Sequence, residues 1–293
     1  MKNIHNMGFK KTKQQDKDAE KEFYNQPIKS ISRINREVLY QVNHQNDLIK
    51  QVTGFASKII TNANLSRMRI LEIGRDGEFT SELRDRYADV DISLTVGDIA
   101  ITQLKDINSL SWKVNLDLEY MPFKENTYDI IFINGVLHHL PVLNICSREL
   151  MRVCKRCIIV ANEPCGDNPL VLLSRFSSRI LSNFFKINTT VNEAMHNMKL
   201  YKNNFFQCGA KDIVIINGDK IYSNGQNWIS YKSHMKKIRK SFPWLLLLIR
   251  SYLQRMLSLY FSKYLFSWNS YIIFITCQSS ADTKNERKND EIT

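Results

Sequence analysis

The sequence predicts an α/β fold with a largely parallel sheet, because short apolar runs alternate with helical patterns over residues 68–164. Five runs have the length and apolar composition of buried strands: 70–73, 91–96, 112–116, 128–134 and 157–161. Apolar residues at helical spacing follow the first and fourth of these runs, over 79–87 and 143–152. Strands joined in this way lie parallel in one sheet, with right-handed crossovers.

Two further strands, 211–216 and 270–277, are predicted to close the sheet as an antiparallel pair, which makes seven strands. Helices are expected over parts of 31–60, 170–185 and 192–206. The predicted organisation is an N-terminal arm with helices (1–61), a main domain (62–278) and a disordered tail (279–293). A long helical insertion (217–269) separates the last two strands.

The stretch 69–80 reads R-I-L-E-I-G-R-D-G-E-F-T and joins the first strand to a helix through Gly74 and Gly77. Glu72 lies inside the apolar run, where its charge requires a ligand or neighbouring donors. Two interpretations fit this stretch. It is either a nucleotide-type site, in which glycines let a ligand approach the helix N-terminus, or a tight turn that binds nothing.

Composition sets broad limits on the class of protein. With 293 residues, of which 43% are hydrophobic, the chain can bury a sizeable core. A formal charge of +12 indicates either an anionic partner or simply a basic surface. Residues 1–26 are polar and lysine-rich, so no secretory signal is predicted. Cys154 and Cys157 form a C-x-x-C without a second pair, so we expect free thiols, no metal site and a cytoplasmic location.

Polar residues follow the predicted strands, at the edge where α/β sheets bind ligands. Together with the glycines and the proline beside them, the residues at this edge are Glu72, Gly74, Gly77, Asp98, Asp117, Asn134, Gly135, His138, His139, Asn162, Glu163 and Pro164. The carboxylate of Asp98 suits the two hydroxyls of a ribose, and Asp117 stands where an adenine edge could be held. The dinucleotide pattern G-x-G-x-x-G is absent, which ranks a dehydrogenase well below other enzymes.

Over residues 68–164 these motifs resemble the class I S-adenosylmethionine-dependent methyltransferases, most closely the branch of quinone and small-molecule methyltransferases. The resemblance rests on L-E-I-G-R-D-G, then G-D, then D-L-E-Y-M-P-F-K-E-N-T-Y-D-I-I-F-I-N-G-V-L-H-H-L, and finally A-N-E-P. It implies a Rossmann-like seven-stranded methyltransferase sheet with helices on both faces, and S-adenosyl-L-methionine as cofactor.

The resemblance also implies roles for individual residues. Glu72, Gly74 and Gly77 would line the methionine and ribose of the cofactor, and Asp98 would bind the ribose hydroxyls. Asp117 and Leu118 would border the adenine, and Asn134 would lie at the methionine end.

His138 and His139 would lie nearest the substrate opening. A histidine with a near-neutral pKa suits the removal of a proton from a hydroxyl acceptor. The alternative is that both histidines are structural and cap the turn after the fourth strand.

The composition of the insertion 217–269 indicates which class of methyl acceptor to expect. Within 231–266 a basic run precedes an apolar, aromatic-rich stretch that Arg250, Arg255 and Lys263 interrupt. This pattern is typical of a helix at the surface of an anionic membrane, but also of a cap or dimer face buried on protein. The first case favours a lipid-linked acceptor and peripheral membrane association, and the second favours a soluble small molecule.

We therefore expect a methyltransferase that modifies oxygen or carbon of a small or lipid-linked acceptor. The glycine loop, Gly74-Arg75-Asp76-Gly77, is shorter than the family's G-x-G-x-G. This departure motivates the alternative of a catalytically degenerate, membrane-associated binding partner. Nucleic acid ranks third among partners, because no RNA-binding module is recognised. The sequence makes no prediction of oligomeric state.

Overall fold

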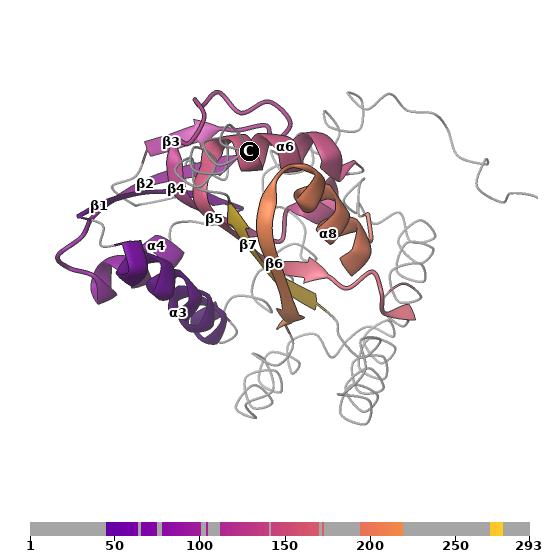
Figure 1. Cartoon of the computed structure of the whole chain (residues 1–293), viewed down its shortest axis with the longest axis horizontal. Helices are drawn as coiled ribbons and strands as arrows, with labels where there is room; N and C mark the ends of the chain where they lie inside the picture. Colours follow the sequence, from indigo (N-terminus) through magenta and orange to yellow (C-terminus); the bar gives the residue numbers. More distant parts are fainter. Residues whose placement is uncertain are drawn as a thin grey trace, which may run out of the picture.

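The computed structural model describes residues 45–63, 66–74, 78–100, 104, 112–140, 142–169, 172, 194–218 and 270–277. Its centre is a seven-stranded sheet with the strand order β3-β2-β1-β4-β5-β7-β6 (Figure 1). The strands are β1 (Arg67–Ile73), β2 (Asp91–Asp98), β3 (Trp112–Asn115), β4 (Tyr128–Asn134), β5 (Cys154–Pro164), β6 (Ala210–Asn217) and β7 (Ser270–Cys277).

All neighbouring strands from β3 to β5 are parallel, and β7 is antiparallel to both β5 and β6. The carboxyl ends of β1, β2, β3, β4 and β5 therefore lie at one edge of the sheet. The seven predicted strands, the parallel core and the antiparallel closing pair are thus confirmed.

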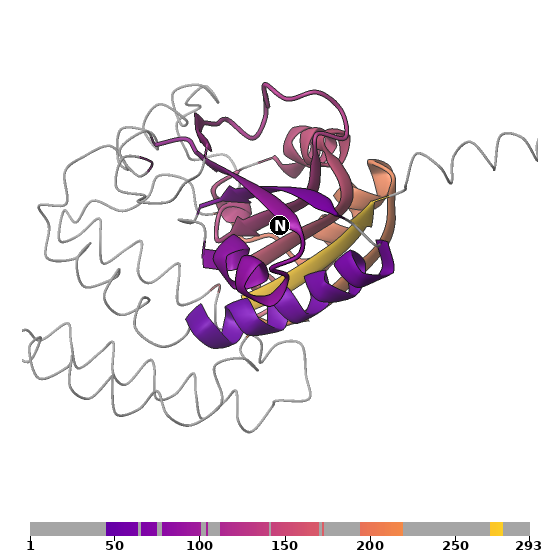
Figure 2. The same cartoon turned by 90° about the vertical axis from the view of Figure 1, so that its left-hand side faces the viewer.

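Helices cover both faces of the sheet (Figures 1 and 2). On one face lie α3 (Gln45–Ala63) and α4 (Glu78–Arg86), and on the other lie α6 (Leu143–Val153) and α8 (Met198–Gln207). Alternate residues of each strand serve the two cores: Ile70 packs on the α3 and α4 side, whereas Leu71 packs on the α6 and α8 side. This arrangement explains why β1 and β4 read as continuous apolar runs rather than alternating ones.

Several element boundaries differ from the sequence prediction by a few residues, and those of β5 and α8 have a clear physical cause. β5 begins at Cys154 rather than at 157 and continues to Pro164, because β4 and β7 supply pairing partners on its two edges. α8 begins at Met198 rather than at 192, since the side chain of Asn197 accepts a hydrogen bond from the Leu200 N–H and caps the helix there.

Several predicted segments lie outside the described residues. They are the arm 1–44, the helix 173–185, the insertion 219–269, the tail 278–293 and Gly77. Within the described ranges, no helix is both long enough and apolar enough to cross a bilayer. The same ranges hold no cluster of three or more His, Cys, Asp or Glu side chains suited to a metal ion.

The core on the α4 side should be sensitive to truncation of Phe132. Its ring is fully buried and stacks on that of Phe79, with 4.6 Å between centroids. We expect Phe132→Ala to lower the free energy of unfolding by about 3–5 kcal/mol, through lost burial and the cavity left behind. Urea unfolding measures this change. Leu200→Ala, at a site 40% exposed on α8, is the control and should change stability by less than about 0.5 kcal/mol.

Candidate functional site

The carboxyl edge of the parallel strands gathers most of the residues predicted to act. Asp98 and Asn134 are the last residues of β2 and β4, Glu72 lies near the end of β1, and Glu163 lies near the end of β5. Because β1 pairs with both β2 and β4, the ends of these three strands are adjacent. This edge is where open α/β sheets bind ligands.

Glu72 is fully buried, and one of its oxygens (Oε1) accepts hydrogen bonds from both the backbone N–H and the hydroxyl of Thr80. Thr80 lies in the first turn of α4, whose backbone N–H groups have no partner within the helix. The carboxylate also interacts favourably with the positive end of the helix dipole. These donors meet one of the two oxygens of the buried carboxylate, and Glu72 thereby joins β1 to α4 across the glycine loop.

Gly74 has a positive φ of +74°, a conformation that only glycine adopts without strain. A Cβ atom at this position would lie 2.5 Å from Cγ2 of Val136 and 2.8 Å from the carbonyl oxygen of Asn134. The turn after β1 thus packs directly against the turn after β4. This contact brings the predicted cofactor loop and the predicted histidine turn together.

Asp98 organises the end of β2. Its Oδ1 accepts the N–H of Ala100 at 2.7 Å, and its carbonyl oxygen accepts the N–H of Leu116 at 2.9 Å. Burial raises the pKa of this carboxyl above its ordinary value, while the Ala100 N–H and the nearby His139 act in the opposite direction.

Asp117 and Leu118 follow β3 at the same edge. The Oδ1 of Asp117 accepts the N–H of Glu119 at 2.9 Å, which fixes a tight turn. Leu118 is buried within this turn. A carboxylate next to an apolar side chain is the combination predicted for the border of an adenine.

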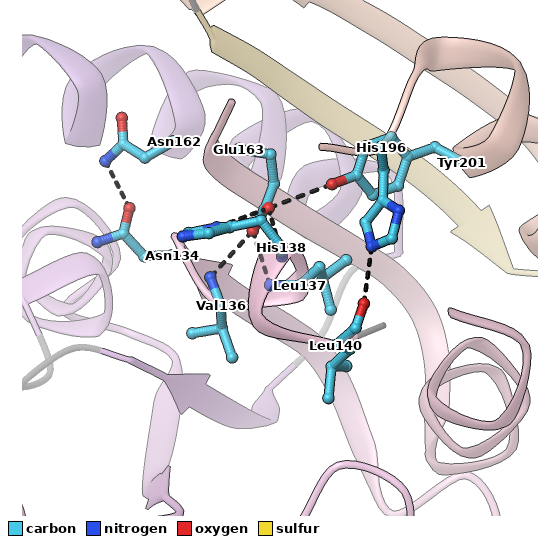
Figure 3. A network of polar contacts seen from close by, with 9 residues as sticks. All are labelled: Asn134, Val136, Leu137, His138, Leu140, Asn162, Glu163, His196 and Tyr201. Atoms are coloured by element: carbon cyan, nitrogen blue, oxygen red, sulfur yellow. Dashed lines mark hydrogen bonds and ion pairs between the residues drawn. The ribbon is translucent and has the colours of Figure 1, made fainter. Parts of the chain in front are cut away.

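The ends of β4 and β5 are joined by an amide pair, in which Nδ2 of Asn162 donates to Oδ1 of Asn134 at 2.6 Å (Figure 3). Asn162 has φ +58° and lies where the register of β5 against β7 shifts between Val160 and Glu163. Such a bulge places an extra residue in the strand and redirects the side chains beyond it. As a result Glu163 is fully buried rather than exposed at the sheet edge.

Glu163 is the functional candidate for which the sequence suggested no role. Its Oε1 accepts the N–H groups of Val136 and Leu137, and its Oε2 accepts the N–H of His138, each at 2.9 Å (Figure 3). These residues open the short 3-10 helix η2 (Leu137–His139), which carries both predicted histidines. The only sequence signal was a single carboxylate in A-N-E-P, directly after the apolar run of β5.

The same carboxylate holds the ring of His138, with Nδ1 at 3.1 Å from Oε2 of Glu163. Burial alone would raise the pKa of Glu163, but His138 and the backbone N–H groups outweigh it and hold the pKa below its ordinary value. Glu163 is therefore ionised at neutral pH, so its Oε2 accepts a hydrogen bond from Nδ1–H of His138. In the neutral form of the ring this leaves Nε2 as the basic nitrogen.

His139 differs from its neighbour. Its ring is only partly buried and is tilted against that of His138, with 4.1 Å between the centroids. Of the two predicted histidines, His138 is the one whose ring bonds directly to a buried carboxylate.

A segment on the far side of η2 completes the site. Ala194 donates its N–H to the carbonyl of His138 at 2.7 Å, and Nε2 of His196 donates to the carbonyl of Leu140 at 2.8 Å. The hydroxyl of Tyr201, on α8, donates to Oε2 of Glu163 at 3.2 Å. No feature of the sequence predicted these contacts, since the segment lies far along the chain from the residues it touches.

Comparison with known proteins is consistent with this geometry. The family model described as a methyltransferase domain matches residues 71–157. A search of curated proteins finds no match.

Solved structures with the same fold include a protein from Galdieria sulphuraria described as a sarcosine dimethylglycine methyltransferase. It is 15% identical, with TM-score 0.51, and the match covers 78% of this chain and 86% of that one. Phosphoethanolamine N-methyltransferase 2 of Haemonchus contortus is 12% identical, with TM-score 0.50, over 74% of this chain and 50% of its own. The CurJ carbon methyltransferase is 13% identical, with TM-score 0.50, over 83% and 57%.

The match spans only about half the length of the latter two proteins. Residues 71–157 thus match a methyltransferase domain, and the seven-stranded sheet has the Rossmann-like methyltransferase fold that the resemblance implied.

The packing of Gly74 leads to a stability prediction. Gly74→Ala places a side chain at positive φ and against the Asn134 carbonyl, so we expect the free energy of unfolding to fall by about 2–4 kcal/mol. Gly54→Ala is the matched control: this position lies within α3, and a Cβ there would meet nothing within 4 Å. The control should leave stability unchanged or raise it by up to about 1 kcal/mol. Equal effects in urea unfolding would contradict the close packing of the two turns.

Proposed function

We propose that this protein transfers a methyl group from S-adenosylmethionine to oxygen or carbon of a small or lipid-linked acceptor. The observation that carries the proposal is the placement of a carboxylate, Asp98, and a histidine paired with a buried carboxylate, His138, at the same edge of the sheet. The first suits a ribose, and the second suits an acceptor that must lose a proton.

The residues at this edge fit the cofactor. One oxygen of Asp98 holds the Ala100 N–H, and the other would accept from the ribose hydroxyls. Asp117 and Leu118 would border the adenine, while Glu72, Gly74, Gly77 and Asn134 would lie towards the methionine part. The methyl group of this cofactor is already electrophilic, so the main task of the protein is to align the acceptor with it.

His138 is the general base in this proposal, with His139 the second candidate. The Nδ1 of His138 donates to ionised Glu163, so Nε2 is the nitrogen that would take the proton from the acceptor. A neutral imidazole with a hydrogen-bonded Nδ1 is well suited to this role.

The nature of the acceptor is supported by two features. The named structural neighbours include a protein described as a sarcosine dimethylglycine methyltransferase, whose named substrates are small molecules, and the CurJ carbon methyltransferase. If the basic, apolar stretch 231–266, which lies outside the described residues, is a membrane-surface helix, the acceptor is amphiphilic, such as a quinone or a carrier-bound precursor.

Calorimetry with S-adenosylmethionine and S-adenosylhomocysteine tests the cofactor site. We expect micromolar binding, weakened at least about tenfold in Asp98→Ala because the ribose hydroxyls lose their carboxylate partner. Asp91→Ala, at the opposite end of β2 in an exposed ion pair with Arg67, is the matched control and should bind normally. If the folded wild-type protein binds neither compound, the proposed methyltransferase activity is refuted. The alternative of a catalytically degenerate binding partner then remains.

Sedimentation with vesicles tests the membrane component. We expect the protein to bind vesicles that contain anionic lipid, to bind neutral vesicles less, and to be released as salt is raised, because screening weakens the attraction. Replacement of Lys236, Lys237, Arg239 and Lys240 by alanine should reduce the binding. Equal retention on neutral and anionic vesicles would argue for a cap or dimer face instead.

A further inference from the structure

Two charged side chains of α6 bind the backbone of the loop that joins β3 to β4. Arg152 and Glu149 form an ion pair through two hydrogen bonds, from Nε to Oε1 at 2.8 Å and from Nη2 to Oε2 at 2.7 Å. The Arg152 guanidinium also donates to the carbonyl oxygens of Phe123 at 2.6 Å and Met121 at 3.1 Å. Oε2 of Glu149 accepts the N–H of Met121 at 3.0 Å. The pair therefore binds both polar backbone groups of Met121.

This use of an ion pair differs from simple support of a helix. The two residues are three positions apart on α6, and their side chains are 28% and 19% exposed, so the pair by itself contributes little to stability. The hydrogen bond from Arg152 holds the pKa of Glu149 below its ordinary value, and the carboxylate is ionised at neutral pH. The planar donors of arginine can bind a carboxylate and neighbouring carbonyls together, which lysine cannot do in the same geometry.

The loop is also attached to α6 at its far end. The backbone N–H of Asn126, which has φ +52°, donates to the carbonyl oxygen of Arg152 at 2.9 Å. Arg152 thus contacts the loop through its side chain and its backbone. The course of the chain from Met121 to Asn126 is therefore determined by the last turns of α6.

The same loop carries Asp117 and Leu118, the residues proposed to border the adenine. Asp117 fixes a tight turn, because its Oδ1 accepts the N–H of Glu119 and its carbonyl oxygen accepts the N–H of Tyr120 at 3.1 Å. Met121 follows this turn directly, and the side chains of Leu118 and Met121 are buried in one core. The turn is therefore held by β3 on one side and by Met121 on the other.

We infer that Glu149 and Arg152 are positioning residues that set the selectivity of the cofactor site for adenine. They hold the backbone of Met121 and Phe123, and thereby place the turn against which the adenine edge would lie. This inference rests on the proposed function, since it takes the proposed border of the adenine as its starting point. It extends that function to two residues of α6 that act through the loop rather than by contact with the cofactor.

Hydrogen–deuterium exchange in the full chain tests the attachment without any ligand. We expect the N–H of Met121 to exchange slowly in the wild-type protein, because it donates to Glu149. Arg152→Gln should speed exchange in peptides that cover 117–123 by about tenfold or more. Arg156→Gln is the matched control: Arg156 is also 28% exposed, but it pairs with Asp129 at the opposite edge of the sheet. Equal exchange in the wild-type protein and Arg152→Gln would contradict the inference.

Base selectivity is the readout that a merely structural role would not change. Calorimetry compares S-adenosylhomocysteine with S-inosylhomocysteine, in which a carbonyl group replaces the amino group of adenine. A carboxylate such as that of Asp117 accepts a hydrogen bond from the amino group but repels the carbonyl oxygen. We expect the wild-type protein and Arg156→Gln to prefer the adenine compound by about tenfold or more, and Arg152→Gln to lose most of this preference. A loss of fold stability alone would weaken the binding of both compounds alike.

Variants of Glu149 keep the test decisive if Arg152→Gln folds poorly. Glu149→Gln retains a carbonyl oxygen that can accept the N–H of Met121, whereas Glu149→Ala does not. We expect Glu149→Gln to retain most of the preference for adenine and Glu149→Ala to lose most of it. A preference that stays at the wild-type value in Glu149→Ala would overturn the inference.

The outcomes distinguish this inference from the proposed function. If the wild-type protein binds S-adenosylhomocysteine and its preference for adenine persists in Arg152→Gln, this inference alone is refuted. If the folded wild-type protein binds neither compound, the proposed function is refuted, and the selectivity inferred from it is refuted as well.

Discussion

The buried carboxylate of Glu163 is the interaction on which the rest of the site depends. It ties together η2, β5 and α8, which are distant in sequence, by accepting hydrogen bonds from each of the other two. A buried charge is stable only if donors surround it, and the donors here belong to the turn that carries His138. The requirement to satisfy this buried carboxylate therefore also determines the position of the His138 side chain.

That carboxylate reaches the interior because of a local irregularity in β5. The register shift near Asn162, with its positive φ, turns Glu163 inward and leaves Asn162 to bond with Asn134. A left-handed conformation in a residue other than glycine costs energy, and it persists because the pairing of β5 with β4 and β7 and the amide bond hold it in place. The irregularity is thus part of how the site is built.

Much of the fold was predictable because both faces of the sheet are buried. The predicted strands 128–134 and 270–277 match β4 and β7 residue for residue. Both strands are buried on two faces, so each appears in the sequence as a continuous apolar run with clear ends. The prediction was less accurate for β5 and α8. The start of β5 depends on the strand that pairs with it. The start of α8 depends on the capping side chain of Asn197, which belongs to a segment that is hydrogen-bonded to η2.

The sequence by itself determined the order of strands and helices and the polar residues at the carboxyl ends of the strands, and the motifs there resemble those of methyltransferases. It also singled out His138 and His139 but gave no means of choosing between them. Only the tertiary structure distinguished the two, because the partner of His138 lies on another strand and is turned inward by a bulge. Hydrophobic periodicity in the sequence shows which face of a helix or strand is buried. The pairing of the Glu163 carboxylate with the His138 ring depends instead on how separate elements pack together.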